Sequence, residues 1–191
     1  MPGTILEALT RRRLGGAVLV LAGVVVAAVV LWPDGGGRTA PQPVRLVSVP
    51  QLGLALAHPS TWKQRIDGRV LRLRGPDGSA VLTFSAPLAG RNPRGVKAAM
   101  ERALLKRLAP AEIVRDGPGR LGARRVTSFE LVGFAADYKR VRALVLIDST
   151  PYRTYAVTLL TAGRPSRRRL AEVQQILATV RLTKPVRRSK K

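Results

Sequence analysis

The stretch LALAHPSTWKQ, from Leu54 to Gln64, marks where the folded domain begins. Its apolar first half predicts a short strand over 53–57, and Pro59 stands at a strand end, where proline is tolerated. Trp62 follows, and its large apolar ring favours a core position over a ligand platform, although it is also our candidate wall of a pocket. His58 is the only histidine of the chain. Histidine catalysis would have to use it, but we expect an ordinary strand-end residue.

The rest of the chain offers His58 no catalytic partners. There is no cysteine, which excludes disulfides, thiolate metal sites and cysteine nucleophiles. No carboxylates fall at the spacing of a metal or calcium site, and no G-x-S-x-G occurs. The glycines at 35–37 do not follow a strand, as a phosphate-binding loop requires. We therefore expect no enzyme, no metal and no cofactor. The enzyme alternative is an envelope hydrolase that uses His58 with a serine such as Ser60.

The segment from Val70 to Pro110 predicts a hairpin and a helix. VLRLR at 70–74 alternates with period two, the turn GPDG follows, and SAVLTFS at 79–85 completes the hairpin. Asn92 and Pro93 are typical of a helix start. Apolar residues then recur at three- and four-residue steps until Pro110. Met100 lies in this apolar stripe, which indicates core packing.

Three longer strands are expected next, over 123–133, 138–148 and 152–161. The middle one becomes apolar on both faces, which is typical of a strand covered on both sides. A second helix is expected from Pro165 or Ser166, with Leu170, Val173, Ile176, Leu177 and Val180 as its buried stripe. A short strand over 180–183 ends the domain.

This order of elements resembles the PsbP-like α/β/α sandwich superfamily, which includes the extrinsic photosystem subunit and Ran-binding nuclear import factors. The residues that carry the resemblance are Pro59-Ser60-Thr61-Trp62 and the closing run Leu177-Ala178-Thr179-Val180-Arg181-Leu182. The resemblance covers about 49–184 and implies an α+β fold, a central antiparallel sheet flanked by helices, and a binding or accessory role without catalysis. The closest setting is that of actinobacterial exported LpqN-type proteins, whose lipidated cysteine a transmembrane anchor would replace here.

The segment from Leu14 to Trp32 is a predicted membrane span. Its nineteen uncharged residues rise about 28 Å as a helix, close to the thickness of a hydrocarbon core. Arg11, Arg12 and Arg13 precede it and set the N-terminus in the cytoplasm. We therefore expect a single-pass signal-anchor in the plasma membrane, with the remaining chain extracytoplasmic. A cleaved signal peptide is the alternative, and a twin-arginine export signal ranks below it.

The expected organisation is a cytoplasmic segment 1–13, the span 14–32, a flexible linker 33–44, a sandwich domain 45–183 and a basic tail 184–191. Glycine and proline dominate the linker, and four basic residues follow Val186 in the tail.

The formal net charge of +23 has two readings. One is attraction to anionic lipid, wall polymer or nucleic acid, and the other is the composition of a GC-rich genome. Nucleic acid is disfavoured because most of the eight aromatic residues fall in predicted strands at core-facing positions. The basic residues proposed as a surface for an anionic partner are Arg140, Arg142, Arg153, Arg167, Arg168 and Arg169.

Together these features favour a membrane-anchored, extracytoplasmic and non-enzymatic binding or accessory domain. Its expected partner is an envelope protein or an anionic envelope component, and its oligomeric state stays open. A carrier of a small apolar ligand is the main alternative, with Trp62 lining its pocket.

Overall fold

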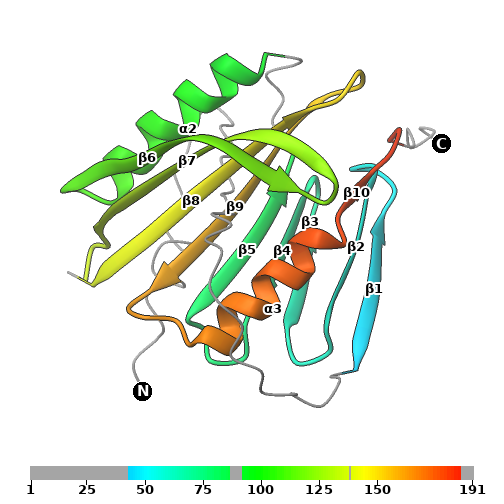
Figure 1. The fold of residues 1–191 in the computed structure, drawn as a ribbon, viewed down its shortest axis with the longest axis horizontal. Helices are drawn as coiled ribbons and strands as arrows, with labels where there is room; N and C mark the ends of the chain where they lie inside the picture. Colours follow the sequence, from blue (N-terminus) through cyan, green and yellow to red (C-terminus); the bar gives the residue numbers. More distant parts are fainter. Residues whose placement is uncertain (1–42, 87–91, 138, 186–191) are drawn as a thin grey trace.

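The computed structural model describes residues 43–86, 92–137 and 139–185 (Figure 1). The elements within these residues are, in chain order, β1 (Val44–Val49), β2 (Leu54–Pro59), β3 (Lys63–Asp67), β4 (Val70–Arg74), β5 (Ala80–Ser85), α2 (Pro93–Arg107), β6 (Ala111–Leu121), β7 (Arg124–Phe134), β8 (Arg140–Ser149), β9 (Thr154–Ala162), α3 (Arg167–Ala178) and β10 (Arg181–Leu182).

The strands form two antiparallel sheets. The large sheet has the order β3-β4-β5-β9-β8-β7-β6, and the small sheet has the order β1-β2-β10. The predicted α+β class, with an antiparallel sheet and two helices, is therefore confirmed. One feature differs from the expected single sheet: the first and last predicted strands pair with each other in a separate sheet. Figure 1 shows α3 on the same side of the large sheet as this small one.

The large sheet carries a hydrophobic core on each face. On one face, α2 packs on β7 and β8 through Val96, Met100 and Leu104. On the other face, α3 and the small sheet enclose a second core around Trp62 and Leu73. Alternate residues of β8 enter the two cores, so this strand is covered on both sides as its sequence predicts. Met100 is a core residue, also as predicted.

Both helices begin where the sequence places their caps. The side chain of Asn92 accepts a hydrogen bond from the Gly95 amide at 2.9 Å, and that of Ser166 accepts one from the Arg169 amide at 3.2 Å. Within the stripe predicted for α3, Val173, Ile176, Leu177 and Val180 are buried. Leu170 is 38% exposed instead, because it lies on the solvent side of the first turn.

Three strands were not predicted from the sequence: β1, β3 and β6. β3 is exposed along its whole length, and its residues KQRID give no apolar alternation. β6 contains Gly117, Pro118 and Gly119, which are typical of a loop, and its pairing with β7 shifts register between Ile113 and Arg115. All three are edge strands, where charge, proline and bulges are tolerated. Val44, predicted as the last linker residue, is the first residue of β1.

The predicted membrane segment, the N-terminal basic residues Arg11, Arg12 and Arg13, and most of the C-terminal tail lie outside the described residues. Tyr138, the expected first residue of β8, also lies outside them. Within residues 43–86, 92–137 and 139–185, neither helix is long and apolar enough to cross a membrane.

Replacing Trp62 tests how the second core is held. Trp62 is 2% exposed, so Trp62→Ala is expected to lower the free energy of unfolding by about 3–5 kcal/mol. Far-ultraviolet circular dichroism during urea unfolding measures the change. Tyr152→Ala is the matched aromatic control because Tyr152 is 52% exposed, and it is expected to change stability by less than about 1 kcal/mol. Equal losses in both variants would contradict the buried position of Trp62.

Candidate anion-binding surfaces

Trp62 is held by a buried polar network on α3. Its indole Nε1 donates a hydrogen bond to Glu172 Oε2 at 2.9 Å. The guanidinium of Arg169 lies over the Trp62 ring, 5.4 Å from its centroid, and forms an ion pair with the same carboxylate. A ring packed in this way does not line an open pocket, so the structure gives no support to the small-ligand carrier. Its core position is as predicted.

Arg169 does not belong to an exposed basic cluster. It is 7% exposed, because it also reaches back to the β4–β5 turn, where its Nη2 lies 3.3 Å from Asp77 Oδ2. Of the three successive arginines, Arg169 is buried, whereas Arg167 and Arg168 are exposed. The prediction that Arg169 faces an anionic partner is wrong, since its charge is used inside the protein.

The Asp77 carboxylate is stabilised in its ionised form. Burial opposes ionisation, but hydrogen bonds from the Ser79 amide and hydroxyl and from Arg169 outweigh it and hold the pKa of Asp77 below its ordinary value. Asp77 thus joins the turn to the first turn of α3.

His58 is a buried strand residue with partners of its own. It is 1% exposed. Its Nδ1 lies 2.8 Å from the Pro59 carbonyl oxygen, and its Nε2 lies 3.3 Å from Gln64 Oε1. Both ring nitrogens therefore face protein oxygens. Ser60, the proposed nucleophile, follows the end of β2, where its amide binds the Pro43 carbonyl. The imidazole nitrogens thus face Pro59 and Gln64 rather than Ser60, so the geometry gives the hydrolase alternative no support.

Exposed arginines gather at one end of the domain, which we call the linker end. In Figure 1, α3 and β1 both begin on the lower side of the domain, and β9 ends at its lower left. The Gly163 amide donates to the Arg140 carbonyl, which places the β9–α3 loop beside the start of β8. The linker-end cluster consists of Arg140, Arg142, Arg164, Arg167 and Arg168, all of them exposed.

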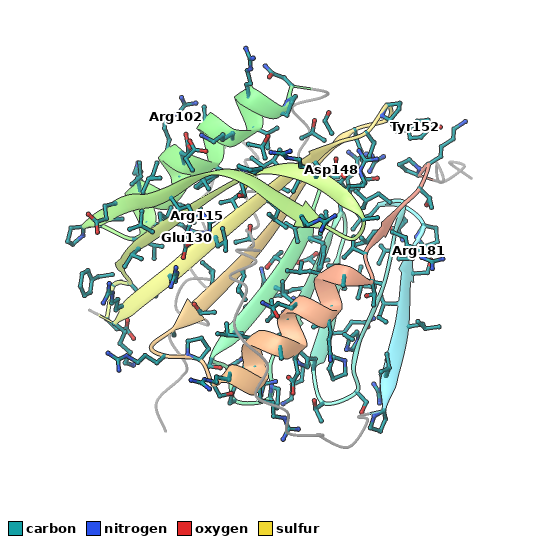
Figure 2. The ribbon with its side chains drawn as sticks, in the orientation of Figure 1. Arg102, Arg115, Glu130, Asp148, Tyr152 and Arg181 are labelled. Atoms are coloured by element: carbon teal, nitrogen blue, oxygen red, sulfur yellow. The ribbon has the colours of Figure 1, made fainter. Side chains whose placement is uncertain are left out.

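Two arginines of this cluster also pair with buried glutamates. Arg142 forms an ion pair with Glu130 of β7, and Arg168 Nε lies 3.2 Å from Glu172 Oε1. Each arginine side chain remains 62% exposed, so its guanidinium still faces solvent. Figure 2 shows Glu130 beside Arg115, its register partner on β6.

Arg153 does not join Arg140 and Arg142. The turn between β8 and β9 spans four residues, closed by the Thr150 amide on the Arg153 carbonyl, and it lies at the opposite end of both strands. There Arg153 Nη1 donates to the Gln51 carbonyl at 3.2 Å. Tyr152, in the same turn, is correspondingly far from the start of α3 in Figure 2. The sequence prediction grouped Arg153 with Arg140 and Arg142 in one basic surface, and that part of the prediction is wrong.

A second basic surface was missed by the sequence analysis. Arg65 stands directly opposite Arg72 across β3 and β4, and Lys63 stands directly opposite Arg74. Leu71 and Leu73 enter the core under α3, so these four cations point to the other face of the sheet. Arg107, at the end of α2, is near enough to affect Arg72. We call these five residues the β3–β4 basic face.

Arg72 lies among charges that affect its ionisation. Burial and the nearby charge of Arg65 lower the pKa of Arg72 from its ordinary value, Asp67 opposes this, and Arg107 adds to it. The signal was present in the sequence: VLRLR places both arginines on one strand face. The same alternation predicts the hairpin, and its polar side forms the basic face.

Comparison with known proteins gives likeness of fold only. No protein-family model and no curated protein matches the chain. A crystal structure from Bacteroides thetaiotaomicron is similar with 17% identity and a TM-score of 0.48, over 73% of this chain and 48% of that one. Cyanobacterial PsbP from Synechocystis is similar with 13% identity and a TM-score of 0.46, over 78% and 98%. The Ran-binding protein Mog1p from Saccharomyces cerevisiae is similar with 5% identity and a TM-score of 0.49, over 75% of this chain and 97% of that one.

The chain spans about half of the Bacteroides structure. The PsbP and Mog1p structures belong to groups that the sequence resemblance names. The exported actinobacterial setting stays a prediction.

The contribution of Asp77 to stability is expected to depend on pH. A carboxylate whose pKa in the folded state lies below its ordinary 3.8 stabilises the fold above that pH, and the stabilisation is lost as pH falls through the folded pKa. Asp77→Asn should therefore lower the free energy of unfolding at pH 7 by about 1 kcal/mol or less, since the side chain is half exposed. Urea unfolding at pH 7 and pH 3 measures this. A difference from the parent that grows toward pH 3 would contradict the assignment.

Proposed function

We propose that the chain is a membrane-anchored, extracytoplasmic and non-enzymatic binding domain whose linker-end cluster contacts anionic lipid headgroups. The observation that carries the proposal is the position of this cluster. Arg140, Arg164 and Arg167 are exposed, and α3, which follows two of them, begins on the lower side of the domain in Figure 1, as does β1, where the chain leaves the predicted linker. The part of the domain that the predicted anchor tethers is thus strongly basic.

The length of the predicted linker supports this orientation. Eleven residues separate the predicted span, which ends at Trp32, from β1. A flexible glycine-rich linker of that length has a root-mean-square extent of about 18 Å. The linker end is therefore the part of the domain held closest to the membrane surface on average. Each basic residue within a Debye length of an anionic surface contributes about 1 kcal/mol.

The carboxylates near this cluster leave its charge in excess. Glu130 and Glu172 are buried and each is already bound to an arginine, and Asp77 pairs with Arg169. Anions of a binding partner can therefore neutralise the remaining positive charge of the linker-end cluster. Anionic headgroups supply them in a two-dimensional array, which suits arginines spread over a strand, a loop and a helix turn.

A binding role also agrees with the chemistry of the described residues. Within the ranges that the structure describes, no three of the histidine, aspartate and glutamate residues gather as metal ligands. His58 is buried and faces the oxygens of Pro59 and Gln64. We infer that the domain works through its surface charge.

A fluorescence experiment on the full chain tests this orientation. The chain has no native cysteine, so Ala136→Cys, just before β8, and Ala123→Cys, in the turn between β6 and β7, each give a single labelling site for an environment-sensitive dye. The labelled chain is placed in nanodiscs of phosphatidylcholine, with or without phosphatidylglycerol. We expect phosphatidylglycerol to shift the emission of the dye at position 136 and not at position 123. Raising the salt to 1 M, where the Debye length is about 3 Å, should abolish the shift.

Matched charge variants assign the effect to particular arginines. Neutralising Arg140, Arg164 and Arg167 to glutamine should remove the shift at position 136. Neutralising Arg120, Arg125 and Arg181, which are exposed toward the opposite end, should leave it in place (Figure 2 labels Arg181). An equal effect of both triple variants, or a shift that does not depend on anionic lipid, would contradict the proposal.

A further inference from the structure

We propose that the β3–β4 basic face, formed by Lys63, Arg65, Arg72, Arg74 and Arg107, is a binding site for an extended polyanion whose charges are phosphate groups. The site is separate from the linker-end cluster, and the two share no residue. The proposal goes beyond the membrane contact because it concerns the other face of the sheet and a different ligand.

The register of β3 and β4 brings like charges into direct opposition. Arg65 faces Arg72, and Lys63 faces Arg74, on adjacent antiparallel strands. Side chains in such positions have Cβ atoms about 5 Å apart, and like charges there are destabilising. An edge strand needs charge to avoid pairing with other chains, but carboxylates on one of the two strands would serve that purpose without repulsion. The arrangement therefore indicates an anion that lies between the paired cations.

The charge balance of this face favours a multiply charged ligand. Five cationic side chains lie there, and Asp67 is one carboxylate that acts on Arg72. Two cations that alternate along a strand are about 7 Å apart, and the face extends from β3 over β4 toward the end of α2. This footprint exceeds that of a single phosphate. A chain of phosphates satisfies several cations at once.

The residue types select phosphate as the ligand group. Four of the five residues are arginines, whose planar guanidinium presents a fork of donors that binds phosphate oxygens in pairs. Beside them, the row that contains Arg65 and Arg72 continues straight across the sheet with Thr83 and Thr158. The row that contains Lys63 and Arg74 continues with Val81 and Leu160, so hydroxyl and apolar side chains both border the basic face on its inner side.

Binding of inorganic polyphosphate to the full chain in phosphatidylcholine nanodiscs tests the proposal. Titration calorimetry at several salt concentrations gives the affinity and its salt dependence. The Arg65→Gln and Arg72→Gln double variant should bind polyphosphate at least about tenfold more weakly than the parent. The slope of log affinity against log salt should fall in magnitude by about 1.4, the value for two lost phosphate contacts on a single-stranded polyanion.

The control carries the same loss of charge elsewhere. Arg140→Gln with Arg164→Gln removes two arginines of the linker-end cluster and should change polyphosphate affinity by less than about twofold. Conversely, the β3–β4 double variant should leave the lipid-dependent fluorescence shift at position 136 unchanged. The two variants therefore distinguish an incorrect polyphosphate site from an incorrect membrane contact.

The melting temperature of the variant distinguishes the loss of a binding site from the loss of the fold. Because Arg65 and Arg72 repel each other, their removal should raise the melting temperature by about 1–4 °C. A variant that melts higher and binds more weakly has lost a binding site and not its fold. The proposal is overturned if both double variants lose affinity equally, if the parent does not bind polyphosphate at physiological salt, or if poly-glutamate binds more tightly than polyphosphate.

Discussion

The interaction of Trp62 with Glu172 and Arg169 holds α3 against the large sheet. A buried carboxylate and guanidinium are tolerated only when their hydrogen bonds are satisfied, and here the indole N–H and the ring face complete the pair. Asp77 extends the network to the β4–β5 turn. The second core closes beneath α3, and the orientation of the helix leaves Arg167 and Arg168 exposed at the linker end. Loss of one partner of such a pair costs about 3–5 kcal/mol.

Most carboxylates of the described residues form ion pairs with basic residues of the same domain. Within the described residues, those that form ion pairs are Asp77, Glu101, Asp116, Glu130, Asp137, Asp148 and Glu172. Glu130, Asp148 and Glu172 are buried, and each binds an arginine. Most basic residues therefore remain at the surface in excess. We infer that this excess is functional at the two places where register or chain connectivity concentrates it.

The sequence predicted the hairpin of β4 and β5, both helix starts and the two-sided burial of β8, because each depends on local periodicity or capping. It did not predict β3 or β6, since edge strands are stabilised by pairing and do not need an apolar pattern. Among the candidate residues, Trp62 and His58 lie where they were expected. The burial of Arg169 depends on Glu172 and on Asp77, which is 92 residues away. The opposition of Arg65 and Arg72 depends likewise on the register of an unpredicted strand.

The side of the membrane on which each part of the chain lies is the most direct test of the proposed role. Single cysteines at Ala8 and at Ala123, in the otherwise cysteine-free chain, are labelled in intact cells with a membrane-impermeant maleimide. A signal-anchor with an extracytoplasmic binding domain predicts labelling at position 123 in intact cells and at position 8 only after permeabilisation. Labelling at position 8 in intact cells, or protection of position 123 until the cells are opened, would contradict it.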